Sequence, residues 1–389
     1  MMVRHGSLFS QLLAVFNRNK FEELVVKHMA ERYAKGFSCW DQFVSMLFCQ
    51  LAQAKSLREI SGGLACCVGK LKHLGMEKAP VKSTLSYANQ HRPWQMYQDL
   101  FYETYDWCRT MTPVSHKFRF KNKLLSLDSS TISLCLSLFP WAKYRRTKGA
   151  VKLHLLLDHE GYLPSYAYLS NGKKHDVAVA RNFPLAPGSI VTMDRGYNDY
   201  SLFSFWTRKG IFFVTRLKEN ADYITEETRE VPQGRNILSD ELIRFAGYRA
   251  IEDCPHIFRR IVAWDAVNQK ELVLLTNHLE FGASTISAIY KDRWQIELFF
   301  KAIKQNLKIK TFVGTSENAL YIQIWTALIA MLLIKFLQLK SKFGWSLSNM
   351  VAFLRWNLFT YRELWEWLDK PFDVMPREVA PAHQQLALF

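Results

Sequence analysis

The alternation of hydrophobic and polar positions divides the chain into helical ends and a strand-rich middle. Apolar residues recur at helical spacing in SCWDQFVSMLFCQLAQ (38–53), which predicts an amphipathic helix. Ser56, with Glu59 three residues later, predicts a second helix that opens with a capping box. A further helix is expected over VKSTLSYANQHRPWQMYQDLFYETYDWC (81–108). The first 115 or so residues therefore read as helical.

The middle of the chain changes to strand patterns. KLLSLDSSTISL (123–134) predicts a first strand, and AVKLHLLLDHEGYLPSYAYLS (150–170) predicts two more that turn at His159-Glu160-Gly161. DVAVARNF (176–183) predicts a short helix with Asp176 as its N-cap, and GSIVTMDRGY (188–197) a fourth strand. This order implies a parallel pairing beside an antiparallel meander.

Beyond these strands we expect a helix over 199–210, a strand over 211–218, a separate patch of short strands, helices from Ile286 and an irregular tail after Pro371. The expected domains are a helical N-terminal DNA-binding domain (1–115), two parts of an α/β core (116–218 and 281–345), a β-rich insertion between them (219–280) and a C-terminal helical segment with the tail (346–389).

Composition narrows the function. The chain has 389 residues and is 49% hydrophobic, enough for a large core. Its net charge of +16 favours a polyanionic partner, first nucleic acid and second an anionic membrane. The apolar segment from Ile324 is interrupted by Lys335 after eleven residues, so we interpret it as a buried core helix, not a membrane span. Seven cysteines, and an N-terminus unlike a secretory signal, favour a cytoplasmic protein with reduced thiols.

Two aspartates stand at strand positions where a carboxylate needs a partner. Asp128 lies inside the apolar run of the first strand, and a carboxylate there must be paired, hydrated or bound to a metal. Asp194 ends the fourth strand. Each has an ordinary alternative, because Asp128 could cap a turn with Ser129 and Asp194 could begin the turn DRGY.

A third carboxylate lies on a helix. At 100° per residue, Tyr290, Arg293, Glu297 and Lys304 share one face, which borders the apolar face. A glutamate there can reach into a cleft. The alternatives are a Glu297–Lys301 pair at i+4 and, for the three other residues, a solvated helix face.

Cations surround the three carboxylates. Those after Asp128 are Lys143, Arg145, Arg146, Lys148 and Lys152, and those after Glu297 are Lys301, Lys304, Lys308 and Lys310. Carboxylates in a basic groove can hold hard divalent cations while the groove holds a phosphate backbone. The sequence therefore predicts metal-assisted phosphodiester chemistry.

These residues carry a resemblance to a known family. The helix reads Y-x2-R-x3-E-x6-K and, together with SLDSST and TMDRGY, resembles the DDE transposases of bacterial insertion sequences, in the insertion sequence four family with its Y-R-E-K signature. The resemblance extends from about Lys121 to Leu337. The N-terminal region is similar to the helical domain that precedes the catalytic core in one branch of these enzymes.

The resemblance implies an RNase H-like catalytic core with a β-rich insertion, preceded by a helical N-terminal domain. It implies that Asp128, Asp194 and Glu297 are the catalytic residues and the ligands of two Mg²⁺ ions, for which Mn²⁺ can substitute. The implied partners are double-stranded DNA, as terminal inverted repeats and target, and a second copy in a synaptic homodimer, with no membrane. Rival functions are an RNase H-like nuclease and a transposase-derived DNA-binding regulator without catalysis.

Six residues are expected to contact DNA. They are the cations Arg293, Lys304, Arg145 and Arg146 and the aromatic residues Tyr290 and Trp264. In relatives with such an insertion the cleaved end closes into a hairpin, and Trp264 could stack on a base flipped from the turn. Trp264 could instead be a core residue of the insertion. The segment STLSYANQHR (83–92) could serve as a helix-turn-helix reader, or belong to an ordinary helical bundle. His154 and His175 are expected to be structural or DNA-facing.

Overall fold

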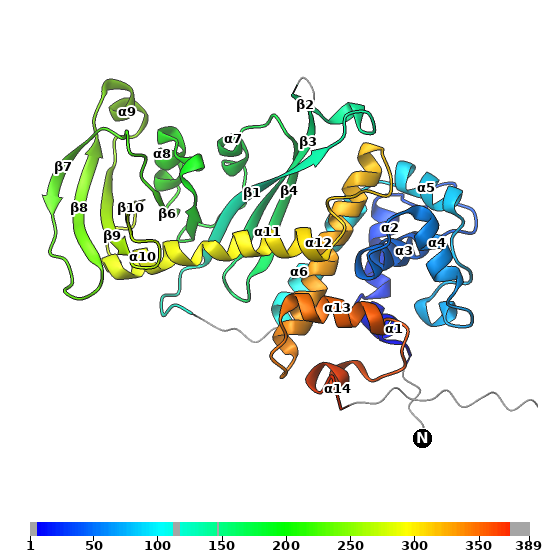
Figure 1. Cartoon of the computed structure of the whole chain (residues 1–389). Helices are drawn as coiled ribbons and strands as arrows, with labels where there is room; N and C mark the ends of the chain where they lie inside the picture. The colour runs from blue at the N-terminus through cyan, green and yellow to red at the C-terminus, as the bar shows by residue number, and fades with distance from the viewer. Residues whose placement is uncertain (1–5, 112–116, 146–147, 374–389) are drawn as a thin grey trace, which may run out of the picture. The chain divides into compact units, whose positions relative to one another are not determined.

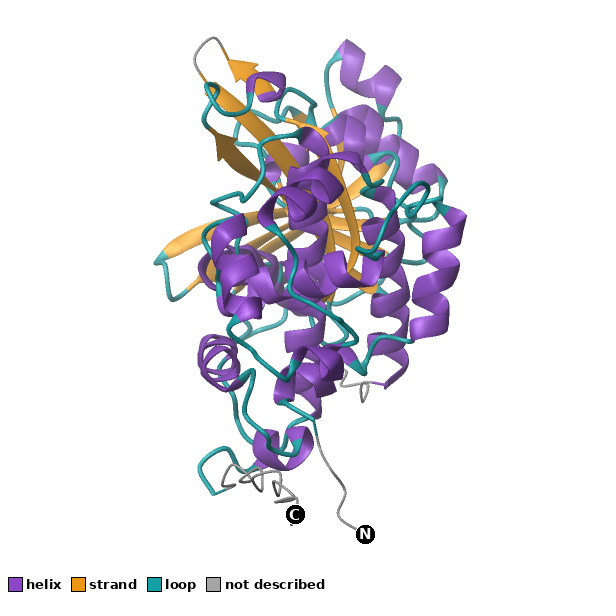
Figure 2. Cartoon of the chain, turned by 90° about the vertical axis from the view of Figure 1, so that its right-hand side faces the viewer, coloured by secondary structure: helices purple, strands orange, loops and turns teal. Residues whose placement is uncertain are grey.

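The computed structural model describes residues 6–111, 117–145 and 148–373. The chain forms two compact units, one from Met1–Pro113 with Ala302–Phe389 and the other from Val114–Lys301. All strands in the described part of the chain lie in the second unit (orange in Figure 2), and the first unit is built from helices (Figure 1).

The helical unit confirms the helical pattern of both ends of the chain. Its helices are α1 (Leu8–Leu13), α2 (Arg18–Lys27), α3 (Cys39–Ala52), α4 (Leu57–Ala65), α5 (Lys82–His91), α6 (Gln95–Met111), α12 (Glu317–Lys340), α13 (Leu347–Asn357) and α14 (Leu364–Asp369), with a 3-10 turn η1 (Leu71–Leu74).

Two local predictions for this unit are wrong. The single helix expected over 81–108 is two helices, because Pro93 lacks an N–H and forces Arg92 into an extended conformation with ψ 137°. Ser56 does cap α4, but the Glu59 carboxylate accepts a hydrogen bond from the Lys55 N–H and not from Ser56, so the capping box is incomplete.

The residues proposed as a DNA reader on α5 are only partly available. Asn89 is buried and accepts a hydrogen bond from Gln42. Arg92 donates to the backbone carbonyls of Ser38 and Phe37. Both side chains hold the helical unit together, because the face of α5 that they occupy packs inward. Ser83 is exposed on the opposite face.

The apolar segment from Ile324 is a core helix, as expected. Helix α12 is long and apolar enough to cross a membrane, yet 89% of its most apolar window is buried inside the protein. The same helix packs against α3 and α6 of the N-terminal segment. Burial also lowers the pKa of Lys335, the one cation that interrupts the apolar run.

The second unit is an α/β fold around one sheet. Its strands are β1 (Leu124–Leu134), β2 (Lys143–Arg145), β3 (Lys148–Asp158), β4 (Leu163–Asn171), β5 (Ile190–Met193), β6 (Phe212–Arg216), β7 (Tyr223–Thr228), β8 (Ile237–Phe245), β9 (Ile257–Asp265) and β10 (Lys270–Thr276). Its helices are α7 (Asp176–Ala180), α8 (Tyr200–Arg208), α9 (Tyr248–Asp253), α10 (Ala283–Asp292) and α11 (Trp294–Asn306), of which the last residues group with the helical unit, and its 3-10 turns are η2 (Pro140–Ala142) and η3 (Arg195–Tyr197).

The core of this sheet is RNase H-like. Strands β3 and β4 pair in antiparallel fashion next to β1, and β5 and β6 follow β1 in parallel, which gives the order β4-β3-β1-β5-β6. The predicted meander, helix and parallel return strand are therefore confirmed. One detail is wrong: the N-cap of α7 is His175, and Asp176 is the first helical residue, with its carboxylate bound to Lys152.

The strands of residues 219–280 do not form a separate patch. Strand β10 pairs with β6, so β10-β9-β8-β7 continue the same sheet (Figure 1). The reason is that Leu272 and Leu274 on β10 pack in one apolar cluster with Val214 of β6. The insertion thus shares its core with the RNase H-like strands.

Helices cover both faces of this sheet. One apolar cluster joins α7, α8 and α9 to strand residues that include Leu125, Leu127 and Met193. The other joins α10 to Leu124 and Ile190. Side chains alternate along a strand, so every second residue after Leu124 and Ile190 faces the α10 side. These residues are Ser126 and Asp128 after Leu124, and Thr192 and Asp194 after Ile190.

Candidate active site

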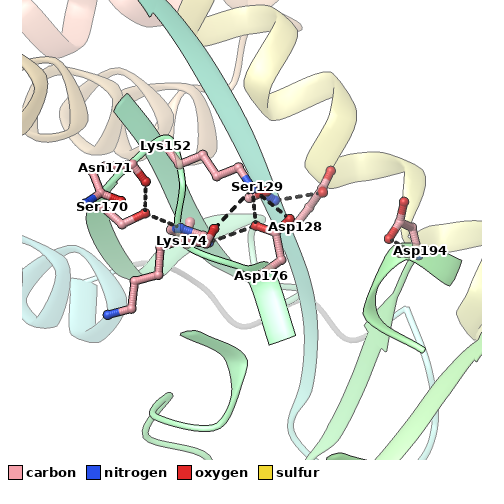
Figure 3. Close-up of polar contacts among 10 residues, drawn as sticks. Asp128, Ser129, Lys152, Ser170, Asn171, Lys174, Asp176 and Asp194 are labelled. Carbon is pink, nitrogen blue, oxygen red and sulfur yellow. Dashed lines mark hydrogen bonds and ion pairs between the residues drawn. The ribbon is translucent and has the colours of Figure 1, made fainter. Parts of the chain in front are cut away.

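Two parallel strands bring the two aspartates together. The last paired residues of β1 and β5 are Leu127 and Met193, and the next residues are Asp128, which is still within β1, and Asp194, which directly follows β5 as the N-cap of η3. Neighbouring strands lie about 4.8 Å apart, so the two backbones are adjacent here. Figure 3 draws the Asp128 side chain on β1 and the Asp194 side chain at the turn that follows β5. Both also follow the alternation that faces the α10 side of the sheet.

Glu297 lies on that side as well, in the first turn of α11. The helix expected from Tyr290 to Lys304 is interrupted at Arg293, which caps α10 with helical φ and ψ of −51° and −30°. Arg293 donates to Glu297 at 2.6 Å, so the partner of the glutamate is the residue four positions before it and not Lys301. The Arg293 side chain is only 11% exposed and Glu297 is 33% exposed.

Asp194 and Glu297 both lie near enough to Asp128 to act on its pKa. Burial raises the pKa of Asp128 to about 6, and the negative charges of Asp194 and Glu297 act in the same direction. Two groups oppose the rise, namely the Ser129 N–H, which donates to Asp128 at 2.7 Å, and the guanidinium of Arg293. Asp128 therefore sits among like charges that its neighbours only partly compensate.

This donor set fits hard divalent cations. Carboxylate oxygens are the ligands that Mg²⁺ prefers, and a bound cation would offset the burial and the like charges that raise the pKa of Asp128. Within residues 6–111, 117–145 and 148–373, no three His, Cys, Asp or Glu side chains lie close enough to hold a metal ion as they stand. Glu297 is at present turned to Arg293.

The Asp194 carboxylate lies against Gly196 in the same turn. Its carboxylate accepts a hydrogen bond from the Gly196 N–H at 2.9 Å, so it also caps the 3-10 turn η3. The alternative that Asp194 begins the turn DRGY is therefore correct for one of its two carboxylate oxygens, Oδ1. A Cβ on Gly196 would lie 2.9 Å from that same oxygen, which is closer than real Cβ contacts.

Gly196→Ala is therefore expected to displace the Asp194 carboxylate and to weaken Mn²⁺ binding by about tenfold, the lower range for disturbing a group that orients a ligand. Calorimetric titration with Mn²⁺ measures the affinity. Gly62→Ala is the matched control, because a Cβ at Gly62 of α4 meets nothing within 4 Å. Equal affinities in both variants would show that Asp194 does not take part in metal binding.

The other predicted site residues are placed as follows. Tyr290 is 7% exposed and belongs to the apolar cluster that joins α10 to Leu124 and Ile190 of the sheet. Trp264 on β9 is half-buried and lies outside both apolar clusters, opposite Glu271 of β10. Lys304 is half-buried in the last turn of α11. Arg145 ends β2, and Arg146 lies outside the described residues.

One predicted groove cation is already neutralised. Lys152 pairs with Asp176 of α7 at 3.0 Å (Figure 3). His154, on the same strand as Lys152, is fully buried and contacts Ser170 Oγ at 2.8 Å through Nε2. Burial lowers the pKa of His154 to about 4, so this histidine is neutral and structural. His175, in contrast, is exposed.

Comparisons with known proteins agree on one family. Residues 119–333 match the family described as Transposase DDE domain, and residues 4–77 match a domain of unknown function (DUF4372). The chain is 29% identical to a protein from Geobacillus stearothermophilus named "Probable transposase for insertion sequence element IS5377", over 70% of this chain and 72% of the relative. It is 28% identical to a Sinorhizobium fredii protein that carries the name transposase y4zB, over 79% of this chain and 84% of that one.

A solved structure of the piggyBac transposase synaptic complex with hairpin DNA is also similar, with a TM-score of 0.43 and 10% identity, covering 91% of this chain and 79% of that chain.

Proposed function

Because this chain belongs to the Transposase DDE domain family and is a DDE transposase of insertion sequences, we propose that it cuts and joins DNA with Asp128, Asp194 and Glu297 as its catalytic residues. The supporting observation is that Asp128 and Asp194 follow the paired ends of two parallel strands, with Glu297 near enough to influence the pKa of Asp128. A polynucleotidyl transferase of this kind exchanges phosphodiester bonds and needs no nucleotide hydrolysis.

The three carboxylates would hold two Mg²⁺ ions, with Mn²⁺ as a substitute. When bound, the ions supply activation of the attacking hydroxyl and charge stabilisation at the leaving 3′-oxygen. The chain's own residues orient the ligands: the Ser129 N–H holds Asp128, the Gly196 N–H holds Asp194, and Arg293 holds Glu297. Arg293 also limits the repulsion among the carboxylates.

The basal test is cleavage of DNA that contains the element's terminal inverted repeat. The wild-type protein is expected to nick such DNA with Mg²⁺ or Mn²⁺ and to remain inactive in EDTA. Joined target products would separate a transposase from a nuclease of the same fold. Binding without cleavage in either metal would favour the rival function, a DNA-binding regulator.

We also propose which residues contact DNA. Lys304, Arg145 and Arg146 are suited to phosphates, because Lys acts as a point charge and Arg can bind two oxygens. Tyr290 and Arg293 are mostly buried, so their proposed DNA contacts rest on the Y-R-E-K signature and not on their exposure. We expect the helical unit to bind DNA, the protein to act in the cytoplasm, and two copies to assemble in the synaptic complex.

The cut-and-paste route is proposed to pass through a hairpin at the cleaved end. Trp264 supports this, since its ring is half-buried and lies outside both apolar clusters. Stacking on an aromatic ring is worth about 1–3 kcal/mol per base, enough to offset the unstacking of one base. On the sheet, Trp264 lies opposite Glu271 of β10.

Trp264→Ala is expected to lower hairpin formation by about tenfold or more while leaving the first nick unchanged, because only the turn needs a flipped base. A labelled end that closes into a hairpin migrates at double length on a denaturing gel. Trp356→Ala is the control, since this exposed tryptophan belongs to the other unit. If the wild-type protein yields only nicked strands or directly joined products at every time point, the hairpin route is wrong and the metal-dependent core remains.

A further inference from the structure

A buried polar network lies next to the carboxylates. Asp292, the last residue of α10, has a side chain that is 2% exposed. It receives contacts from Lys117 Nζ at 2.5 Å, from His159 Nδ1 at 2.6 Å and from the Tyr162 hydroxyl at 3.1 Å. Burial acts to raise the pKa of Asp292, but the His159 and Lys117 contacts outweigh it and lower the pKa to about 2. Asp292 is thus a carboxylate at neutral pH.

The network reaches the strand that carries Asp128. His159 Nε2 lies 2.7 Å from the Oγ of Ser126, which is fully buried on β1. Ser126 and Asp128 are two residues apart and so share one face of the strand. His159 also donates its backbone N–H to the carbonyl of Leu124 at 3.1 Å. The imidazole therefore links β1 to the end of α10.

The other end of the network is joined to Glu297. Asp292 directly precedes Arg293, whose guanidinium binds Glu297 at 2.6 Å. The chain passes from α10 to α11 at this point, where Arg293 keeps helical φ and ψ and the N–H groups of Arg293 and Ile296 donate to the carbonyls of Tyr290 and Arg293. Contacts of the Asp292 side chain add a tertiary constraint, because they tie the junction to two other segments of the unit, the stretch before β1 through Lys117 and the β3–β4 turn through His159 and Tyr162.

Backbone strain indicates that the network has a cost. Tyr162 has φ +53°, a left-handed conformation that is an outlier for a bulky residue. Such strain persists where surrounding contacts enforce it and is common at functional sites. The hydroxyl of Tyr162 reaches Asp292 from this strained turn.

The serine, histidine and aspartate contacts follow the order of a nucleophilic triad, but they do not form one. Ser126 has no exposed surface, and the adjoining cavity, lined by Lys117, Phe120 and His159, measures about 30 Å³. Ser126 does not line this cavity, and a hydroxyl without exposed surface cannot reach an acyl or phosphoryl substrate. The network therefore acts through its neighbours.

We propose that Asp292 and His159 are positioning residues that hold Glu297 in register with Asp128 for metal binding. The proposal rests on the proposed function of the three carboxylates and adds the device that orients the third of them. Neither residue contacts the metal or the DNA. Loss of the Asp292 charge frees the junction at Arg293, so that Glu297 samples positions away from the two aspartates.

The test compares Asp292→Asn with Asp240→Asn. Asp240 is 3% exposed and binds Arg259 at 2.5 Å between β8 and β9, so it is an equally buried carboxylate without a link to β1 or α11. Both variants are expected to lose thermal stability. Only Asp292→Asn is expected to weaken Mn²⁺ binding, by about 10- to 100-fold, as for other groups that orient metal ligands. Mn²⁺ binding is measured on the full chain by electron paramagnetic resonance without DNA.

Amide hydrogen exchange gives a second readout. In Asp292→Asn, exchange over residues 293–301 should become faster, whereas Asp240→Asn should leave that segment unchanged. If Asp292→Asn does not fold, Tyr162→Phe removes only the hydroxyl contact and is expected to weaken Mn²⁺ binding severalfold. Wild-type affinity in the folded variant, Asp292→Asn or otherwise Tyr162→Phe, overturns the positioning role. A wild-type protein that neither binds Mn²⁺ nor cleaves DNA instead overturns the proposed function itself.

Discussion

Asp128→Asn, Asp194→Asn and Glu297→Gln are each expected to abolish Mg²⁺-dependent cleavage of end-containing DNA and to leave DNA binding nearly intact. Each change removes one ligand charge while preserving the shape of the side chain and the cationic surface. Metal catalysis contributes several kcal/mol, so the loss should be on the order of 10³-fold or more. Cleavage is measured on labelled DNA in Mg²⁺, and binding by gel shift in Ca²⁺.

Glu227→Gln is the control for this series. Glu227 is an exposed carboxylate on β7, with its side chain 57% exposed, so its loss changes the net charge by the same amount. It should cleave like the wild-type protein. A member of the series that retains near wild-type cleavage in Mg²⁺ is not a metal ligand.

The positions of the two aspartates in the fold can be predicted from the sequence for a physical reason. Asp128 interrupts an alternating apolar strand, and Asp194 ends another one after a strand-helix-strand step, which places both on adjacent parallel strands. These signals are local and need no knowledge of the rest of the fold. The same holds for α12, whose run of apolar residues predicts a core helix.

The tertiary partners of Glu297 are less accessible from the sequence. The helical wheel places Arg293 on a polar stripe that borders the apolar face, which agrees with its 11% exposed side chain, but periodicity alone does not show that Glu297 pairs with Arg293 in place of Lys301. Asp292 and His159 were missed altogether, since a carboxylate and an imidazole 133 residues apart give no local pattern. The available signal was the position of Asp292 beside the signature arginine.

Misjudged faces have a similar origin. Asn89 and Arg92 look like surface groups on α5, yet they bond to α3 and the segment before it, because helix packing decides which side faces inward. The insertion was expected to stand apart, whereas β10 completes the edge of β6. An edge strand has unpaired N–H and C=O groups, which can pair with any strand that shares its apolar core. Strand propensity alone does not predict which strand that is.

A second large effect concerns stability without metal. The pKa of Asp128 is raised from 3.8 to about 6 in the folded protein. The folded state therefore keeps a proton that the unfolded state has released between about pH 4 and 6, and stability falls as the pH rises through this window. A shift of two pKa units is equivalent to about 3 kcal/mol, which the ionised carboxylate costs the metal-free protein at pH 8.

Asp128→Asn is consequently expected to raise the free energy of unfolding at pH 8 in EDTA by up to about 3 kcal/mol, although it abolishes cleavage. The gain should vanish near pH 4, where the wild-type carboxyl is protonated, and should shrink in Mg²⁺, which stabilises only the wild-type protein. Urea unfolding at both pH values measures it. Asp240→Asn should lose stability at pH 8, because its carboxylate is paired with Arg259. A destabilised Asp128→Asn would mean that Arg293 and the Ser129 N–H already compensate the charge, and that no cation is needed to hold Asp128 beside Asp194.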